Sequence, residues 1–199
     1  MKRVGLTGSI GMGKSATAAL FREAGIPVFD ADACVHDLYA RGGAAVGPVG
    51  EAFPGVVVDG AVDRERLSAR LHADPGDFAR LEAIVHPLVA AERAAFLADA
   101  EARQAPFVVL DIPLLFETGG DARVDVVIVV HAPEPVRRTR VLQRPGMTEA
   151  KLDAIIARQT ADSIKRERAD YTIETSGGIE DARQEVGRIV EALGGPPHS

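Results

Sequence analysis

The residues from Gly8 to Ser15 read Gly-Ser-Ile-Gly-Met-Gly-Lys-Ser, which is the spacing of a phosphate-binding loop, or P-loop. Glycines let backbone N–H groups turn toward a phosphate, and the helix that follows adds the positive end of its dipole. We expect Lys14 to reach the β- and γ-phosphates of a nucleoside triphosphate and the Ser15 hydroxyl to bind Mg²⁺. A glycine-rich turn can match this pattern by chance, but here a strand-like run precedes it and a helix-forming segment follows. The expected nucleotide contacts of the loop are Gly8, Gly11, Met12, Gly13, Lys14, Ser15 and Ala16.

Three aspartates stand where apolar runs end. Asp30 and Asp32 follow the run that begins at Ile26, and they could orient an incoming hydroxyl and act on a metal through water. Either could instead cap the helix that we predict over 33–39, because Asp is a preferred N-cap residue. We assign the catalytic role to Asp32. Asp111 has the position of the aspartate that supports Mg²⁺ in P-loop proteins, although an acid can also simply end a strand.

Arginines recur in the segment that begins with Pro133. In phosphoryl transfer, arginines stabilise charge on the migrating group, often from a mobile part of the chain. We therefore predict a lid over 144–168 with a hinge at 143–148, while some of these arginines form a solvated basic face. The arginines at the start of this region are Arg137, Arg138, Arg140 and Arg144.

Two other reactive residue types stand alone. His86 precedes a proline, where a histidine usually marks a helix end, so the residue itself leaves its function open. Cys34 is the single cysteine, which excludes an internal disulfide. With no base evident nearby, we expect Cys34 to be a half-buried helix residue and not a nucleophile.

The elements that must position these residues follow from apolar runs and turn signals. A strand, a helix over 14–23 closed by Gly25, and a second strand follow in close succession, which predicts a parallel sheet with a right-handed crossover. Ligands bind such sheets at the carboxyl ends of the strands. We expect an α/β fold, a P-loop kinase-like parallel five-stranded sheet flanked by helices. The predicted strands are 2–7, 26–29, 107–111, 125–131 and 170–173.

The middle of the chain differs from the rest in its pattern. Residues 41–62 are rich in turn signals and predict loops, whereas apolar residues at helical spacing follow from 63 to 103. Pro87 is expected to break this helical run. We expect 34–105 to be a mostly helical insertion that binds the acceptor, within a single domain. Toward the end of the chain, helices are predicted from Thr148 to about Ala161 and from Ile179 to Leu193.

Composition limits the partners of this chain of 199 residues. The formal net charge of −6 argues against general binding of nucleic acid. No apolar run approaches the roughly 20 residues that span a bilayer, and the first residues lead directly into the P-loop, unlike a signal peptide. We expect a cytoplasmic protein without nucleic acid or membrane partners.

The absence of certain motifs narrows the class of P-loop protein. The chain contains no asparagine, so it lacks the Asn-Lys-x-Asp motif of GTPases, and it has no Asp-x-x-Gly. A small-molecule kinase with a helical acceptor region and an arginine-bearing lid fits the layout best. The alternatives are a kinase of the shikimate or nucleoside monophosphate type and, less favoured, a nucleotide-binding protein without catalytic activity.

Five motifs together resemble the dephospho-CoA kinase family, and the resemblance extends from residue 4 to about 190. It implies transfer of the γ-phosphate of ATP to the ribose 3′-hydroxyl of dephospho-CoA, the last step of coenzyme A synthesis. The motifs are Leu6 to Ser15, Asp30-Ala31-Asp32, His86-Pro87-Leu88, Asp111 to Glu117 and Arg158-Gln159.

The resemblance also implies roles for single residues. Asp32 matches the proposed base, Arg138 the arginine near the transferring phosphate, and His86 the histidine of the CoA-binding region. Leu114 and Leu115 would line the acceptor crevice. The adenine of ATP would lie between Arg144 and the loop Thr175-Ser176-Gly177, as in related kinases. The chain departs from the family at this loop, which often contains an asparagine, and at Pro145-Gly146, where an acidic residue is frequent.

Overall fold

The computed structural model describes residues 1–74 and 76–196 and contains two compact units. Unit 1 is built from Met1–Phe29 and the chain from Ala100 onward, and unit 2 is Asp30–Asp99. None of the helices in the described ranges combines the length and apolarity needed to cross a membrane.

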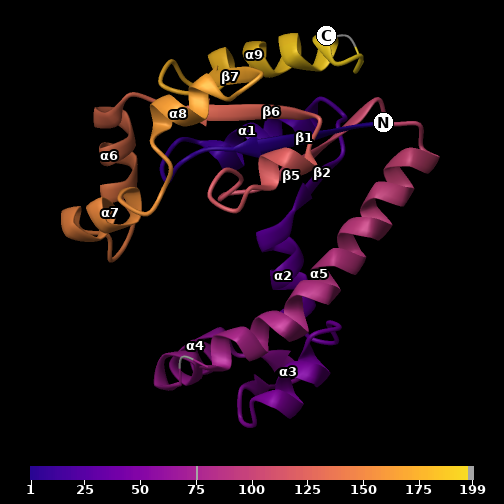
Figure 1. Cartoon of the computed structure of the whole chain (residues 1–199), viewed down its shortest axis with the longest axis vertical. Helices are drawn as coiled ribbons and strands as arrows, with labels where there is room; N and C mark the ends of the chain where they lie inside the picture. The colour runs from indigo at the N-terminus through magenta and orange to yellow at the C-terminus, as the bar shows by residue number, and fades with distance from the viewer. Residues whose placement is uncertain (75, 197–199) are drawn as a thin grey trace. The chain divides into compact units, whose positions relative to one another are not determined.

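A five-stranded parallel sheet forms the centre of unit 1 (Figure 1). Its order is β2-β5-β1-β6-β7, so β1 is the middle strand, and Leu6 of β1 aligns with Asp111 of β5 and Ile128 of β6. The predicted fold class is confirmed, although β2 covers Val28–Asp30 and not 26–29. The strands are β1 (Lys2–Thr7), β2 (Val28–Asp30), β5 (Phe107–Asp111), β6 (Val126–His131) and β7 (Tyr171–Glu174).

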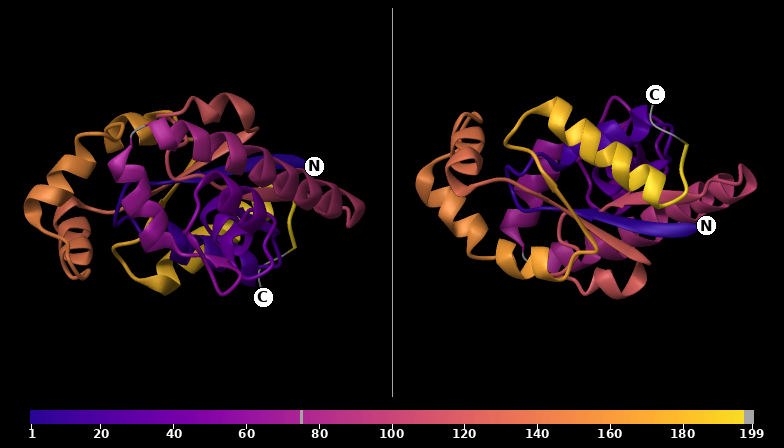
Figure 2. Two further views of the ribbon diagram at one scale, coloured as in Figure 1. Left: turned by 90° about the horizontal axis from the view of Figure 1, so that it is seen from below. Right: turned by 90° about the horizontal axis from the view of Figure 1, so that it is seen from above.

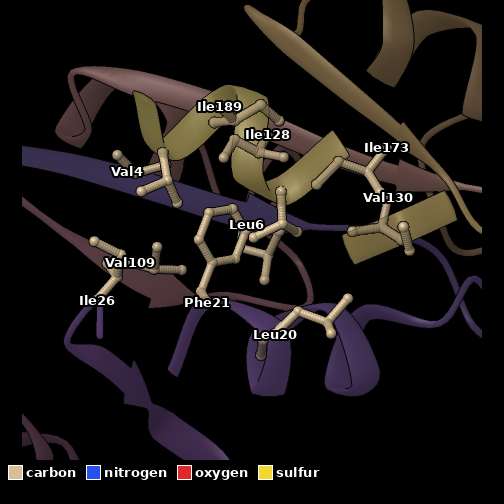
Figure 3. Close-up of a cluster of buried hydrophobic side chains, with 14 of the residues drawn as sticks. Val4, Leu6, Leu20, Phe21, Ile26, Val109, Ile128, Val130, Ile173 and Ile189 are labelled. Carbon is tan, nitrogen blue, oxygen red and sulfur yellow. The ribbon is translucent and has the colours of Figure 1, made fainter. Parts of the chain in front are cut away.

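Two helices cover one face of this sheet. They are α1 (Lys14–Glu23) and α9 (Ile179–Ala192), and Figure 2 shows α9, in yellow, lying across the strands. In Figure 3 the fully buried Phe21 of α1 approaches Leu6 of β1 and Val109 of β5. The P-loop joins β1 to α1, so this packing fixes both ends of the loop.

The opposite face of the sheet is covered by the segment that follows β5. Alternate residues of a strand point to opposite faces, so Val127 and Val129 of β6 pack here against the buried Leu115, while Ile128 and Val130 belong to the first face.

The rest of unit 1 consists of a short 3₁₀ helix before β6 and three helices between β6 and β7. The cap predicted at Thr148 is confirmed, because its side chain accepts a hydrogen bond from Lys151 N at 3.3 Å. The helix that begins there ends at Ile156, not near 161 as predicted, and a separate short helix follows it. These elements are η1 (Gly120–Arg123), α6 (Glu134–Leu142), α7 (Glu149–Ile156) and α8 (Asp162–Glu167).

Unit 2 contains a helix where the sequence predicted loops. This helix, α3, tolerates Pro48 because the proline lies in the first turn, where a backbone N–H has no helical acceptor in any case. Burial of Val49 and Phe53 offsets the low helix propensity of its glycines. The elements of unit 2 are α2 (Ala31–Tyr39), α3 (Val46–Ala52), the antiparallel pair β3 (Val57–Val58) and β4 (Ala61–Val62), α4 (Arg64–Ala73) and α5 (Gly76–Ala102), whose residues from Ala100 onward belong to unit 1.

Pro87 does not break α5, contrary to prediction, and lies inside the helix. A proline in this position removes the hydrogen bond to the carbonyl of Ala83. Apolar residues on both sides of it pack into the same cluster, among them Val85 and Leu88, so burial holds the helix together across the proline.

Candidate active site

Close backbone packing requires two of the P-loop glycines. A Cβ atom at Gly8 would lie 2.7 Å from the Val130 carbonyl oxygen, and one at Gly11 would lie 2.4 Å from Val141 Cγ2. Gly11 also has a φ of +79°, a region that other residues rarely adopt. The loop therefore packs directly on β6 and α6.

The loop leads into a helix whose first turn is open to a ligand. Gly13 is the N-cap of α1, with φ +89°, and no side chain caps this end. The first N–H groups of a helix have no acceptor within it, and the helix dipole attracts anions to the same place. Lys14, Ser15 and Ala16 thus present backbone donors of the kind that bind phosphate.

Lys14 and Asp111 form an ion pair beside this turn. Asp111 is 3% exposed and Lys14 is 15% exposed, so each supplies the partner that a buried charge requires. The pair forms because β1 and β5 are neighbours whose carboxyl ends meet at the P-loop. The structure thus brings together two of the residues that the sequence assigned to phosphate and metal.

The donor set at this place fits Mg²⁺. In the described part of the chain, no three His, Cys, Asp or Glu side chains gather into a metal-binding cluster. Mg²⁺ usually binds to nucleotide phosphates and water, with only one or two protein oxygens. The exposed Ser15 hydroxyl and the Asp111 carboxylate are such oxygens.

A cavity of about 300 Å³ lies next to the P-loop. Its lining includes Arg144 and Thr175, which the sequence assigned to the adenine site, and Arg140, which it did not. Ser176 and Gly177 line a different cavity of about 510 Å³, together with His131 and several acidic side chains. The full lining of the first cavity is Gly11, Gly13, Ala16, Thr17, Arg140, Arg144, Thr175, Gly178, Ile179 and Ala182.

The arginines of α6 have separate partners. Arg138, the expected catalytic arginine, contacts carboxylates of Glu134, Glu149 and Asp153, the last at 2.9 Å. Arg137 is 6% exposed and donates to Asp162 Oδ2 at 2.7 Å. In this structure Arg138 is therefore held by α6 and α7.

The turn between α7 and α8 and the first residue of α8 contact the P-loop, which the sequence did not predict. Gln159 Oε1 accepts a hydrogen bond from Ile10 N at 3.2 Å, and Asp162 Oδ1 accepts one from Ser9 Oγ at 2.5 Å. Gln159 belongs to the Arg158-Gln159 motif of the family resemblance, which implied no such contact, and nothing in the sequence marked Asp162. The second half of the expected lid is thereby joined to the P-loop.

The remaining acid and histidine candidates belong to unit 2. Asp30 is the N-cap of α2 and accepts from the N–H groups of Asp32 and Ala33, both at 3.0 Å. Because Asp30 is the cap, the carboxylate of the exposed Asp32 in the first turn is not. His86 is exposed on α5. Burial, Glu92 and Asp37 raise the pKa of the half-buried Cys34 thiol, the opposite of an activated nucleophile.

The two leucines after β5 have different environments. Leu115 is completely buried in the core on the second face of the sheet, while Leu114 is 45% exposed. Of the pair expected to line an acceptor crevice, Leu114 is exposed and Leu115 is not.

Comparisons with known proteins identify the family of this chain. The family model for dephospho-CoA kinase matches residues 2–181. A dephospho-CoA kinase of Rhodopseudomonas palustris is 55% identical over 99% of this chain and 98% of its own length. One of Bradyrhizobium diazoefficiens is 57% identical over 96% of this chain and 94% of its own. A crystal structure of a Thermus thermophilus protein, 35% identical, superposes with a TM-score of 0.77 over 98% of both chains. By sequence, extent and fold, the chain belongs to the dephospho-CoA kinase family.

Proposed function

We propose that this protein transfers the γ-phosphate of ATP to the ribose 3′-hydroxyl of dephospho-CoA, giving coenzyme A and ADP. The observation that carries the proposal is the P-loop with Lys14 and Asp111 paired beside it, in a chain that belongs to this kinase family. We place the reaction in the cytoplasm, where ATP is available and where thiols, including the substrate's own, stay reduced.

The nucleotide would bind along the P-loop. Backbone N–H groups of the first turn of α1 would hold its phosphates, and Lys14 would leave Asp111 to contact the β- and γ-phosphates. Adenine would lie in the cavity of about 300 Å³, because its lining includes Arg144 and Thr175, to which the family resemblance assigns the adenine. Mg²⁺, held by Ser15 and Asp111, would neutralise phosphate charge.

The acceptor side of the reaction rests on unit 2 and on Leu114. Asp32 would orient the ribose hydroxyl and accept its proton, since Asp30 already caps the helix. His86 would bind the CoA portion, as the family resemblance implies. The residues of 34–105 would thus form the acceptor-binding insertion.

The region 144–168 would act as a lid. Arg138, just before it, would exchange its carboxylate partners for the transferring phosphoryl group, whose charge it would stabilise. Positioning and charge stabilisation, more than covalent chemistry, are what this transfer requires.

The test is ADP release from Mg-ATP with a panel of acceptors, with the product identified by mass spectrometry. Dephospho-CoA should accelerate ADP release and gain one phosphate at the 3′ position. A response to shikimate or a nucleoside monophosphate, with none to dephospho-CoA, would overturn the proposed acceptor and leave the nucleotide site standing. ADP release that no acceptor accelerates would refute the kinase assignment.

A further inference from the structure

Thr175 connects three elements at the edge of the nucleotide cavity. It directly follows β7, is 7% exposed, and its N–H donates to the His131 carbonyl at 3.0 Å, which extends the pairing of β6 with β7. Its hydroxyl lies 2.8 Å from the carbonyl oxygen of Met12 in the P-loop. The same hydroxyl lies 2.8 Å from Arg140 Nη1 of α6, and Arg140 Nη2 donates to the Thr175 carbonyl at 2.6 Å.

The direction of these hydrogen bonds is fixed by the chemistry of arginine. A guanidinium group can only donate, so the Thr175 hydroxyl must accept from Arg140. Its one proton is then left for a carbonyl oxygen, and Met12 O at 2.8 Å is nearer than His131 O at 3.4 Å. The chain of donors therefore runs from Arg140 through Thr175 to the Met12 carbonyl.

Binding of the Met12 carbonyl determines where the next N–H points. Met12 C=O and Gly13 N–H belong to one peptide unit, and in a trans peptide these two groups point in opposite directions. The described residues contain no cis peptide bond. Because Thr175 holds the carbonyl on one side, the Gly13 N–H is directed to the other side, and none of the hydrogen bonds found among the described residues starts from it.

We propose that Thr175 is a positioning residue that sets the Met12–Gly13 peptide so that the Gly13 N–H binds a phosphate of the nucleotide. The inference rests on the proposed function only in that ATP occupies the P-loop. The positive charge of Arg140 polarises the hydroxyl and the peptide beyond it, which strengthens the Gly13 N–H as a donor. Thr175 stands in the loop where the family often has an asparagine, and its hydroxyl supplies the one donor that the Met12 carbonyl needs.

The experiment compares Thr175→Val with Thr175→Ser. Valine keeps the shape but removes the hydroxyl, leaving the Met12 carbonyl and Arg140 without this partner, and serine restores it. We expect Thr175→Val to raise the KM for ATP and the Kd for ADP about tenfold, the size of one lost buried hydrogen bond. The KM for dephospho-CoA should stay within about twofold. The affinity for adenosine, which has no phosphate, should also stay within about twofold, because valine keeps the volume of the side chain in the cavity wall and the hydroxyl that it removes is already bound to Met12 and Arg140. Thr175→Ser should return the ATP and ADP values to within about twofold of wild type.

The matched control is Thr139→Val, because the Thr139 hydroxyl, on the same helix as Arg140, donates within α6 to Pro135 O at 2.9 Å. It should leave all four values unchanged. The proposal is refuted if Thr175→Val binds ADP as wild type does, if serine fails to rescue, or if adenosine is lost in proportion to ADP. If Thr175→Val does not fold, Thr175→Ala takes its place in the same comparison with serine. ADP binding is measured by calorimetry without acceptor, so this test does not depend on the reaction. If the wild type binds ADP but does not phosphorylate dephospho-CoA, the proposed reaction is refuted and the role of Thr175 can still be tested.

Discussion

The buried ion pair between Glu117 and Lys165 offers a direct test of what holds unit 1 together. Lys165 is 1% exposed, Glu117 is 14% exposed, and Lys165 Nζ lies 2.9 Å from Glu117 Oε1. Glu117 Oε1 also accepts a hydrogen bond from Thr160 N at 2.7 Å. The pair thus ties α8 and the turn before it to the segment after β5.

Removing one partner leaves the other charge buried, which costs about 3–5 kcal/mol. The loss of stability in Glu117→Met should lie at the upper end of this range, because the charge that it leaves unpaired, Lys165, is the more deeply buried of the two. Lys165→Met should cost less, since Glu117 keeps the Thr160 N–H and some contact with water. In a chain of this size about 1 kcal/mol corresponds to roughly 2–4 °C, so a loss of about 5 kcal/mol in Glu117→Met should lower the Tm of unit 1 by roughly 10–20 °C.

The assay is urea unfolding followed by circular dichroism, with Glu117→Met, Lys165→Met and the double variant compared. The double variant should recover most of the loss, because two unbranched apolar side chains can replace a buried pair. Glu185→Met and Arg188→Met, an exposed pair 2.7 Å apart, form the control and should cost less than about 1 kcal/mol each. The reasoning fails if Glu117→Met is as mild as this control, or if the double variant loses the sum of the single losses.

Acid should weaken the same pair. Burial works to raise the pKa of the Glu117 carboxyl, but Lys165 and the Thr160 N–H outweigh it and hold the pKa below its ordinary value of 4.5. The stabilisation is therefore complete above that value and is lost as the pH falls through the lower, folded pKa. The difference in unfolding free energy between wild type and Glu117→Met should shrink over that interval.

Three further predictions concern the site and its surroundings. Asp32→Asn should lower kcat roughly 10²- to 10⁴-fold with little change in ATP affinity, which steady-state kinetics measures, and a nearly active variant would exclude Asp32 as the base. Asp30→Ala should instead cost about 1 kcal/mol of folding stability through the lost helix cap, which unfolding measures. Gly11→Ala should weaken ATP binding because its Cβ meets a side chain of α6, which calorimetry checks, and unchanged affinity would contradict the packing. Burial and then Arg166 lower the pKa of His131, against the opposing effect of nearby carboxylates, so NMR titration should give a midpoint below 6.5 that rises in Arg166→Gln. Since the unfolded chain then binds more protons, stability should fall as the pH drops below 6.5, and a midpoint above 6.5 would contradict this.

Features encoded within a few residues could be predicted from the sequence. The P-loop, the five strands and the Thr148 cap each depend on local spacing, and the structure contains the strands and the cap. The choice of Asp32 over Asp30 as the non-capping acid could be stated only as a preference, because both have the composition of a cap. The structure shows that Asp30 caps α2.

Features that depend on distant residues could not be predicted. Helix α3 forms in a segment of glycines and a proline because Val49 and Phe53 are buried, and α5 passes through Pro87 for the same reason. The contacts of Thr175 with Met12 and of Asp162 with Ser9 join residues far apart in the chain. No local pattern indicates them, since they exist only after the sheet order has brought these loops together.

The strand order also has a consequence for the sequence of events during synthesis. β1 and β2 emerge first, but they are not neighbours in the sheet, because β5 lies between them. β1, with its buried Val4 and Leu6, must therefore wait for residues 107–111 before it gains its first partner. Unit 2 is continuous in the chain and its apolar cluster contains only its own residues, so all residues of that cluster have been synthesised once the chain reaches Asp99. On the ribosome unit 2 can fold while β1 is still unpaired, so β1 is buried after unit 2 although it is made before it.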